Sequence, residues 1–347
     1  MLREFEERGA RSVENDRMIF AELAEHYREN YLKEAEYVDG RKVGGLRSVS
    51  SAKTFLNSLC EHFSNRRLRT ITYGDIQRFR STRLKTPIKR SEPKKPIKRI
   101  EQQAPTKRSE QRSIASVNRE LTLLRRMMGI AEREGWIIKN PFDMGEPLIN
   151  PADEKKRERI LSREEEMRLL EACTGRTSHL RPILICALDT GMRHGEILKL
   201  IWADIDFTNG LITVRAFNTK TMRERQVAMT IRLEQELWKL YQTAQNKNAL
   251  VFGIKDNVKR SFNTVRSTAK LPDVRFHDLR HTAATRLVAK HLPLSEVGRV
   301  LGHTQPTTTY RYVNSNVETA KRAALALDTF QAEIQTEKTE ETKERIN

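Results

Sequence analysis

Residues 275–281 read RFHDLRH, and three other short segments carry a similar mixture of cations, imidazoles and phenols. They are TGMRHGE at 190–196, LGH at 301–303 and TTYRY at 308–312. An arginine fork can grip two phosphodiester oxygens at once, and a histidine can move a proton. A tyrosine can attack phosphorus when its neighbours lower the cost of ionising the phenol. Together the four segments predict a site that acts on a phosphodiester.

In this order the four segments resemble the catalytic boxes of the tyrosine recombinase (phage integrase) family, over roughly residues 160–330. The resemblance implies that a tyrosine attacks a DNA phosphate, forms a 3′-phosphotyrosyl link and frees a 5′-hydroxyl. It implies no cofactor and no metal, because protein cations supply the charge. Arg193 and Arg280 match the family's two phosphate-binding arginines, and Lys220 matches its general acid. His277 and His303 match its histidine positions, and Tyr312 matches its nucleophile.

Lys220 is located by a predicted hairpin. The strand-like segment LITVR at 211–215 follows an Asn209-Gly210 turn signal, and a second extended segment, QVAM, covers 226–229. Lys220 lies between these segments and is therefore expected at the hairpin tip. The family's lysine also lies at such a tip.

Simpler interpretations of these residues exist. Arg193 could be an ordinary cation in the first turn of a helix. His277 and His281 have the i, i+4 spacing of a zinc site, although the cation between them would repel a metal and no third ligand is evident. Tyr310 competes with Tyr312 as the nucleophile, and the family's spacing from the Gly-His box favours Tyr312.

The charge of the whole chain favours a polyanionic partner. Its 347 residues carry a formal net charge of +18, so we expect double-stranded DNA as the partner. A solvated basic surface is the alternative. No apolar run reaches the length of a membrane span, so we expect a cytoplasmic protein with no membrane contact.

The N-terminal part, residues 1–145, is predicted to be all-helical. Apolar stripes indicate helices that include 55–63 and 117–131, and two more are expected around 18–33 and 73–83. The resemblance implies that this unit is the family's core-binding (SAM-like) domain, which clamps one face of the duplex.

A nine-residue repeat interrupts this domain within an insertion at 84–112. Its copies read PIKRSE at 87–92, PIKRIE at 96–101 and PTKRSE at 105–110. Proline at every ninth position opposes continuous helix, and the Lys-Arg pairs leave little apolar surface for a core. The repeat is either a phosphate-tracking arm or a tolerated duplication.

A polar linker is expected at 146–159, followed by a catalytic domain at 160–330. This domain should be mixed and mostly helical, with a small antiparallel sheet. Ser162 and Glu165 form a capping box for its first helix, from Glu166, and an apolar helix ends at Gly191. Residues 320–330 form a narrow apolar face, which packs either on its own domain or on a neighbouring subunit. Residues 331–347 are predicted to be a disordered charged tail.

These observations predict a multidomain protein of α and α+β class that acts as a site-specific DNA recombinase or integrase. The resemblance implies a homo-oligomer on DNA, with a dimer at each site and a tetrameric synapse. Two alternatives remain at this point. One is a DNA-relaxing enzyme like the type IB topoisomerases, and the other is a DNA-binding protein without cleavage activity.

Overall fold

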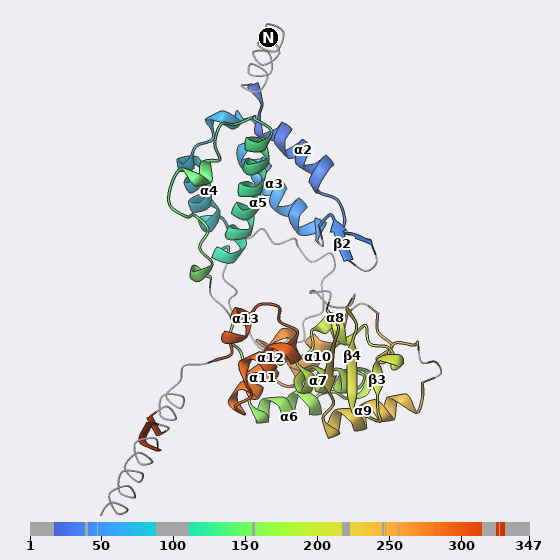
Figure 1. Cartoon of the computed structure of the whole chain (residues 1–347). Helices are drawn as coiled ribbons and strands as arrows, with labels where there is room; N and C mark the ends of the chain where they lie inside the picture. The colour runs from blue at the N-terminus through green and yellow to red at the C-terminus, as the bar shows by residue number, and fades with distance from the viewer. Residues whose placement is uncertain are drawn as a thin grey trace, which may run out of the picture. The chain divides into compact units, whose positions relative to one another are not determined.

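The computed structural model describes residues 17–38, 41–46, 48–87, 111–154, 157–216, 223–244, 246, 248–255, 257–313, 324–325 and 327–329. The chain divides into two compact units, Met1–Arg157 and Glu158–Asn347 (Figure 1). The repeat copies after Pro87, Lys220 and the charged tail fall outside the described residues.

Helices build the core of unit 1. The expected helices are found as α2 (Phe20–Tyr31), α3 (Val49–Phe63), α4 (Tyr73–Lys85) and α5 (Ile114–Arg133). Thr72 and Ser113 cap α4 and α5 by accepting hydrogen bonds from backbone amides of the first turn. The apolar stripes of these helices meet in one core, which includes Phe20, Leu23, Leu59, Phe63, Phe79, Leu121 and Leu124.

A small antiparallel hairpin, β1 (Glu36–Val38) and β2 (Arg41–Gly44), accompanies these helices. This hairpin was not expected from the sequence. The dipeptide Asp39-Gly40 between the strands is a hairpin signal, but the strands are too short to show a clear alternation. Short 3-10 turns complete the unit at η1 (Leu68–Thr70), η2 (Pro141–Asp143) and η3 (Pro151–Asp153).

Part of the segment expected to be a linker is attached to α5. The side-chain amide of Asn118 donates to the Asn150 carbonyl at 3.2 Å and to Glu154 Oε1 at 2.9 Å. Asn118 is buried, and these two bonds satisfy the donor hydrogens of its amide nitrogen. Residues 150–154 are therefore held by unit 1.

Unit 2 combines helices with a three-stranded antiparallel sheet of order β3-β4-β5. The strands are β3 (Ile205–Asp206), β4 (Leu211–Val214) and β5 (Arg225–Ala228). The helices are α6 (Arg163–Glu171), α7 (Leu180–Thr190), α8 (His194–Ile197), α9 (Ile231–Tyr241), α10 (Lys259–Thr268), α11 (Phe276–Ala289), α12 (Leu294–Leu301) and α13 (Pro306–Tyr310), with 3-10 turns η4 (Gly175–Thr177) and η5 (Trp202–Asp204).

The helix signals of unit 2 are found at the expected places. Ser162 and Glu165 form the capping box, and α6 begins at Arg163, slightly before the predicted start. The helix α7 ends at Gly191, which adopts a left-handed φ of 61°. The packed helices α11, α12 and α13 lie together on one side of the unit, and β3 and β4 lie on the other (Figure 1).

Among the described residues, no helix has both the length and the apolar character needed to cross a membrane.

Candidate active site

Arg280 lies at the centre of the cluster of predicted site residues. It is in the second turn of α11 and only 3% exposed. Its Nη1 donates to the Gly191 carbonyl at 2.7 Å, and its Nη2 donates to the Leu301 carbonyl at 2.9 Å. Desolvation, followed by the nearby charge of Arg193, lowers the pKa of Arg280 to about 10, so it stays ionised at neutral pH. The ends of α7 and α12 thus hold a buried cation in a fixed direction.

His303 follows α12 and contacts Arg280 directly. Its Nε2 lies 2.9 Å from Arg280 Nη2, and its Nδ1 lies 2.9 Å from Thr309 Oγ1. Because a guanidinium can only donate, Nε2 must accept, which leaves the proton on Nδ1 to be donated to Thr309. Desolvation, followed by the charges of Arg280 and Arg193, lowers the pKa of His303 to about 4. His303 is therefore a neutral imidazole with one defined tautomer.

Arg193 caps the short helix α8, and its side chain reaches the turn at Gly302 that follows α12. Its Nη1 pairs with Glu196 Oε1 at 2.8 Å, and its Nη2 donates to the Gly302 carbonyl at 3.3 Å. Its backbone N–H also donates to Glu196 Oε2 at 2.9 Å. The side chain keeps 26% of its surface exposed, so Arg193 is less buried than Arg280.

Tyr312 lies against this cluster, whereas Tyr310 does not. The Tyr312 ring is stacked with His303 at a centroid distance of 6.0 Å and lies 5.4 Å from the His281 ring. Tyr312 is 5% exposed and Tyr310 is 60% exposed. The structure therefore places Tyr312, the tyrosine favoured by the spacing, beside the arginines and histidines.

His277 lies at the N-terminal end of α11 and is exposed. Its ring meets that of His281 edge-on at 5.1 Å. Partial desolvation, followed by the charges of His281 and Arg280, lowers the pKa of His277 below its ordinary value. Within the described part of the chain, no group of three or more His, Cys, Asp or Glu side chains is arranged to hold a metal ion, so this pair lacks a third ligand there.

The predicted hairpin around Lys220 exists as the antiparallel pair β4 and β5. Val214 is in register with Arg225. Lys220 belongs to the connection between these strands and lies among residues 217–222, outside the described ranges.

Three residues that the sequence analysis did not select also belong to the cluster. Glu196 is 2% exposed and bonds both Arg193 and Arg225, and Thr309 bonds His303. The spacing of Glu196, three residues after Arg193, is the signal of a cap partner at N3 and could have indicated it. Arg225 carries no local signal, because its partners come from distant parts of the chain.

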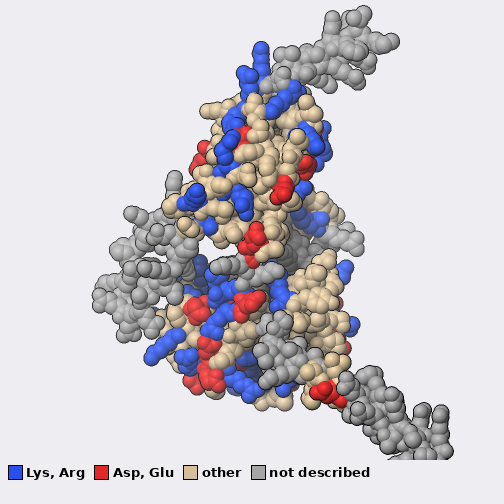
Figure 2. Space-filling view, turned by 90° about the vertical axis from the view of Figure 1, so that its left-hand side faces the viewer, with Lys and Arg blue, Asp and Glu red and all other residues tan. Residues whose placement is uncertain are grey.

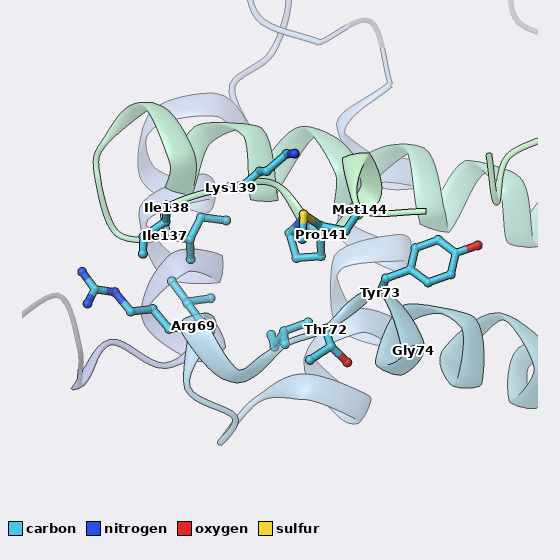
Figure 3. A pocket seen from close by; sticks show the side chains of 11 residues that line it. Arg69, Thr72, Tyr73, Gly74, Ile137, Ile138, Lys139, Pro141 and Met144 are labelled. Carbon is cyan, nitrogen blue, oxygen red and sulfur yellow. The ribbon is translucent and has the colours of Figure 1, made fainter. Parts of the chain in front are cut away.

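Two pockets differ in the kinds of side chain that line them. A hollow of about 400 Å³ lies beside His303 and is also lined by Arg299 and Tyr310. A second pocket, of about 580 Å³, lies in unit 1 and is mostly apolar, with Ile138 and Met144 in its wall (Figure 3). Its lining contains no carboxylate, histidine or cysteine side chain, so it offers little acid–base chemistry.

Basic side chains extend beyond the cluster. On the face drawn in Figure 2, Lys and Arg side chains are spread over the described surface of each unit, with Asp and Glu among them. This distribution agrees with a net charge of +18 and gives each unit cations that can meet a polyanion.

Comparison with known proteins points to one group. Residues 159–319 match the model of the phage integrase family. The chain is 30% identical over 202 residues to the shufflon-specific DNA recombinase of Escherichia coli, a match that covers 57% of this chain and 50% of that protein. The chain therefore spans about half the length of this curated relative.

The fold is that of solved integrases. The Tn1549 transposon integrase (aa 82–397), solved in complex with circular intermediate DNA, matches with a TM-score of 0.64 at 15% identity, covering 89% of this chain and 99% of that one. A lambda integrase dimer bound to a COC′ core site matches with a TM-score of 0.64 at 17% identity, covering 88% and 80%. Its tetramer bound to a Holliday junction matches with a TM-score of 0.62 at 16% identity, covering 86% and 78%.

Proposed function

We propose that this chain, whose residues 159–319 belong to the phage integrase family, is a site-specific DNA recombinase that cleaves and rejoins strands through a 3′-phosphotyrosyl intermediate. One observation carries the proposal. A buried tyrosine, Tyr312, is packed against His303 and His281, next to the buried cation Arg280. A site that only bound phosphate would need the cations but would not need the phenol beside them.

The arginines are the phosphate ligands in this proposal. Arg193 is partly exposed, and Arg280 is fixed by two carbonyl oxygens. Their forks can bind the non-bridging oxygens of the scissile phosphate and stabilise the charge that accumulates in the pentavalent transition state. Because the protein holds these cations in place before DNA arrives, little reorganisation is needed at the moment of reaction.

The chemical step is a transfer of phosphorus from one oxygen to another. The Tyr312 oxygen bonds to phosphorus, the bond from phosphorus to the 5′ oxygen breaks, and the phenol proton leaves. The lowered pKa of His277 leaves it neutral at pH 7, so it can accept that proton. Lys220 supplies a proton to the departing 5′ oxygen. A 5′-hydroxyl from another strand then reverses the step, releases Tyr312 and completes strand exchange.

The proposed partner is double-stranded DNA, bound by a homo-oligomer with a dimer at each site and a tetramer at the synapse. The solved relatives in dimeric and tetrameric DNA complexes support this assembly. The described residues near the C-terminus also leave apolar surface uncovered, since Leu325 and Leu327 are 66% and 64% exposed. A neighbouring subunit in the synapse would cover such a surface.

A covalent selection tests the function without a known target sequence. The purified chain is incubated with a pool of nicked duplexes that carry a randomised core, and SDS-resistant protein–DNA adducts are isolated and sequenced. We expect one sequence family to be enriched and two duplexes of that family to exchange strands. Relaxation of supercoiled DNA without strand exchange would indicate a topoisomerase, and binding without an adduct would indicate a non-cleaving DNA-binding protein.

A further inference from the structure

Arg225, the first residue of β5, lies in the cluster although the catalytic proposal gives it no role. Its side chain is 7% exposed. Its Nη2 pairs with Glu196 Oε2 at 2.7 Å, and its Nε donates to the Val300 carbonyl at 2.9 Å. Arg225 thus joins the sheet to α8 and to the last turn of α12.

The carboxylate that binds Arg225 also binds Arg193. Glu196 accepts from Arg225 Nη2 and from the Arg193 backbone through Oε2, and from Arg193 Nη1 through Oε1. One buried carboxylate is therefore shared by two guanidinium groups. Without Arg225, Arg193 would be the remaining cation bonded to Glu196. A phosphate would then have to compete with the Glu196 carboxylate for binding to Arg193.

The other side of Arg225 faces the turn that leads to His303. A Cβ placed on Gly302 would lie 2.9 Å from Arg225 Nη1 and 3.0 Å from its Cζ, so the guanidinium lies directly against this glycine. The Gly302 carbonyl also accepts from Arg193. Nη1 of Arg225 is buried and has no hydrogen-bond acceptor among the described residues, so packing against the turn accounts for its location.

We propose that Arg225 is a positioning residue for the phosphate site, because it holds Glu196 and the turn at Gly302 in fixed relation and so sets the separation of Arg193 from His303. The inference rests on the proposed recombinase function. A lysine could keep the charge near Glu196, but its single ammonium group could not also replace the planar contacts to Val300 and Gly302. Arg225 therefore contributes geometry as well as charge.

The first test needs no DNA. The histidine ring nitrogens of the ¹⁵N-labelled full chain are followed by NMR as a function of pH in the parent, Arg225→Met, Arg225→Lys and Arg232→Met. Arg232 is a matched control, because it also bridges two carboxylates, Asp189 and Glu166, in the same unit. We expect Arg225→Met to raise the pKa of His303 and to disturb its Nδ1-protonated tautomer, and Arg232→Met to change neither.

The second test measures single-turnover adduct formation on the nicked duplex recovered from the pool. We expect Arg225→Met to slow cleavage by roughly 100-fold, the size of effect that a misplaced reacting group produces, with little change in the Kd for duplex. Arg225→Lys should recover only part of the rate, and Arg232→Met should cleave like the parent at temperatures where every variant is folded.

The two tests separate the possible failures. If the parent forms no adduct with any duplex, the proposed function fails, and the NMR titration still decides whether Arg225 positions His303. An Arg225→Met variant with an unchanged His303 titration and a parental cleavage rate would overturn the inference. A loss of rate that is matched in Arg232→Met would also overturn it, because the effect would then be one of general stability.

Discussion

Two tyrosines separated by one residue have opposite environments in this protein. Tyr312 is 5% exposed and stacked on His303, whereas Tyr310 is 60% exposed and lines the hollow beside that histidine. Their chemical roles should differ accordingly. Tyr312 lies in the cluster with the arginine and histidine side chains, whereas Tyr310 is mostly exposed to solvent.

We therefore expect Tyr312→Phe to abolish the covalent DNA adduct and to leave duplex affinity nearly unchanged, because the lost hydroxyl is the proposed nucleophile. Tyr310→Phe is the matched control and should still form the adduct. SDS gel electrophoresis of labelled nicked duplex measures both. An adduct that survives in Tyr312→Phe but disappears in Tyr310→Phe would assign the reaction to the other tyrosine.

His303 should also make folding stability depend on pH. Its pKa is lowered from an ordinary value of 6.5 to about 4, so the unfolded chain takes up the proton first as the pH falls. The stability that this histidine contributes is complete above about pH 6.5 and is lost towards pH 4, with a slope of at most about 1.4 kcal/mol per pH unit.

Urea unfolding of the parent and of His303→Gln between pH 7 and pH 4.5 checks this expectation. The free energy of unfolding should fall more steeply for the parent, because the carboxylates that titrate in this range are common to both proteins and cancel in the difference. Parallel curves would show that His303 does not titrate differently in the folded and unfolded states.

At the scale of the element, the end of α12 determines where His303 lies. Gly302 adopts a φ of 68°, and the amides of Gly302 and His303 donate back to Arg299 and Gly298 at 3.0 and 2.9 Å. This is a glycine-terminated helix end, in which the left-handed residue turns the chain out of the helix. The guanidinium of Arg225 lies against the same residue, so the position is restricted by shape as well as by backbone angle.

A pair of alanine substitutions separates these two restrictions. Gly210 has nearly the same φ, 66°, but no atom lies within 4 Å of its added Cβ. Gly210→Ala should cost about 1 to 2 kcal/mol, from backbone strain alone. Gly302→Ala should cost about 1 to 3 kcal/mol more because of overpacking, and it should also slow cleavage. Equal losses of stability in thermal unfolding would show that Arg225 moves aside without cost.

The elements that could be predicted from the sequence are those with local signals. The helices α3 and α5 have clear apolar stripes, α6 has a capping box, and Gly191 marks the end of α7. The short hairpin of β1 and β2 was missed because its strands are too short for a periodic pattern.

In the candidate site, too, residues with a local sequence signal could be predicted and residues located by tertiary structure could not. Arg193, Arg280, His303 and Tyr312 could be selected from the four short segments, and the fold brings these four residues together. Arg225 could not be selected, because its role depends on Glu196, Val300 and Gly302, whose positions around it are set by tertiary structure. Long-range packing of this kind leaves no trace in local spacing.

At the scale of the whole molecule, the residues on either side of the basic repeat are close neighbours in space. Pro87 and Gln111, which flank the undescribed residues of the repeat, form an antiparallel bridge. Residues 88–110 carry eight lysines and arginines against three glutamates. Because the flanking residues lie side by side, a short Gly-Ser connection can replace 88–110 without stretching unit 1.

We expect this replacement to leave the melting temperature nearly unchanged and to weaken duplex binding. Each phosphate contact that is lost should reduce the slope of log Kd against log salt concentration by about one unit. Titrations of labelled duplex at several salt concentrations measure the slope. A second variant with the eight cations changed to glutamine serves as a control for segment length. An unchanged slope in both variants would identify the repeat as an inert connection.

The burial of Tyr312 against His281 and His303 of its own chain has a genetic consequence. In the proposed assembly each subunit would therefore carry its own nucleophile and phosphate ligands, so two differently damaged subunits would not complement each other. Cells that co-express Arg280→Ala and Tyr312→Phe chains should remain recombination-negative, whereas a nucleophile donated to a neighbour would restore some activity in mixed assemblies. A cell that inherits only these two alleles would therefore contain no subunit that is active on its own.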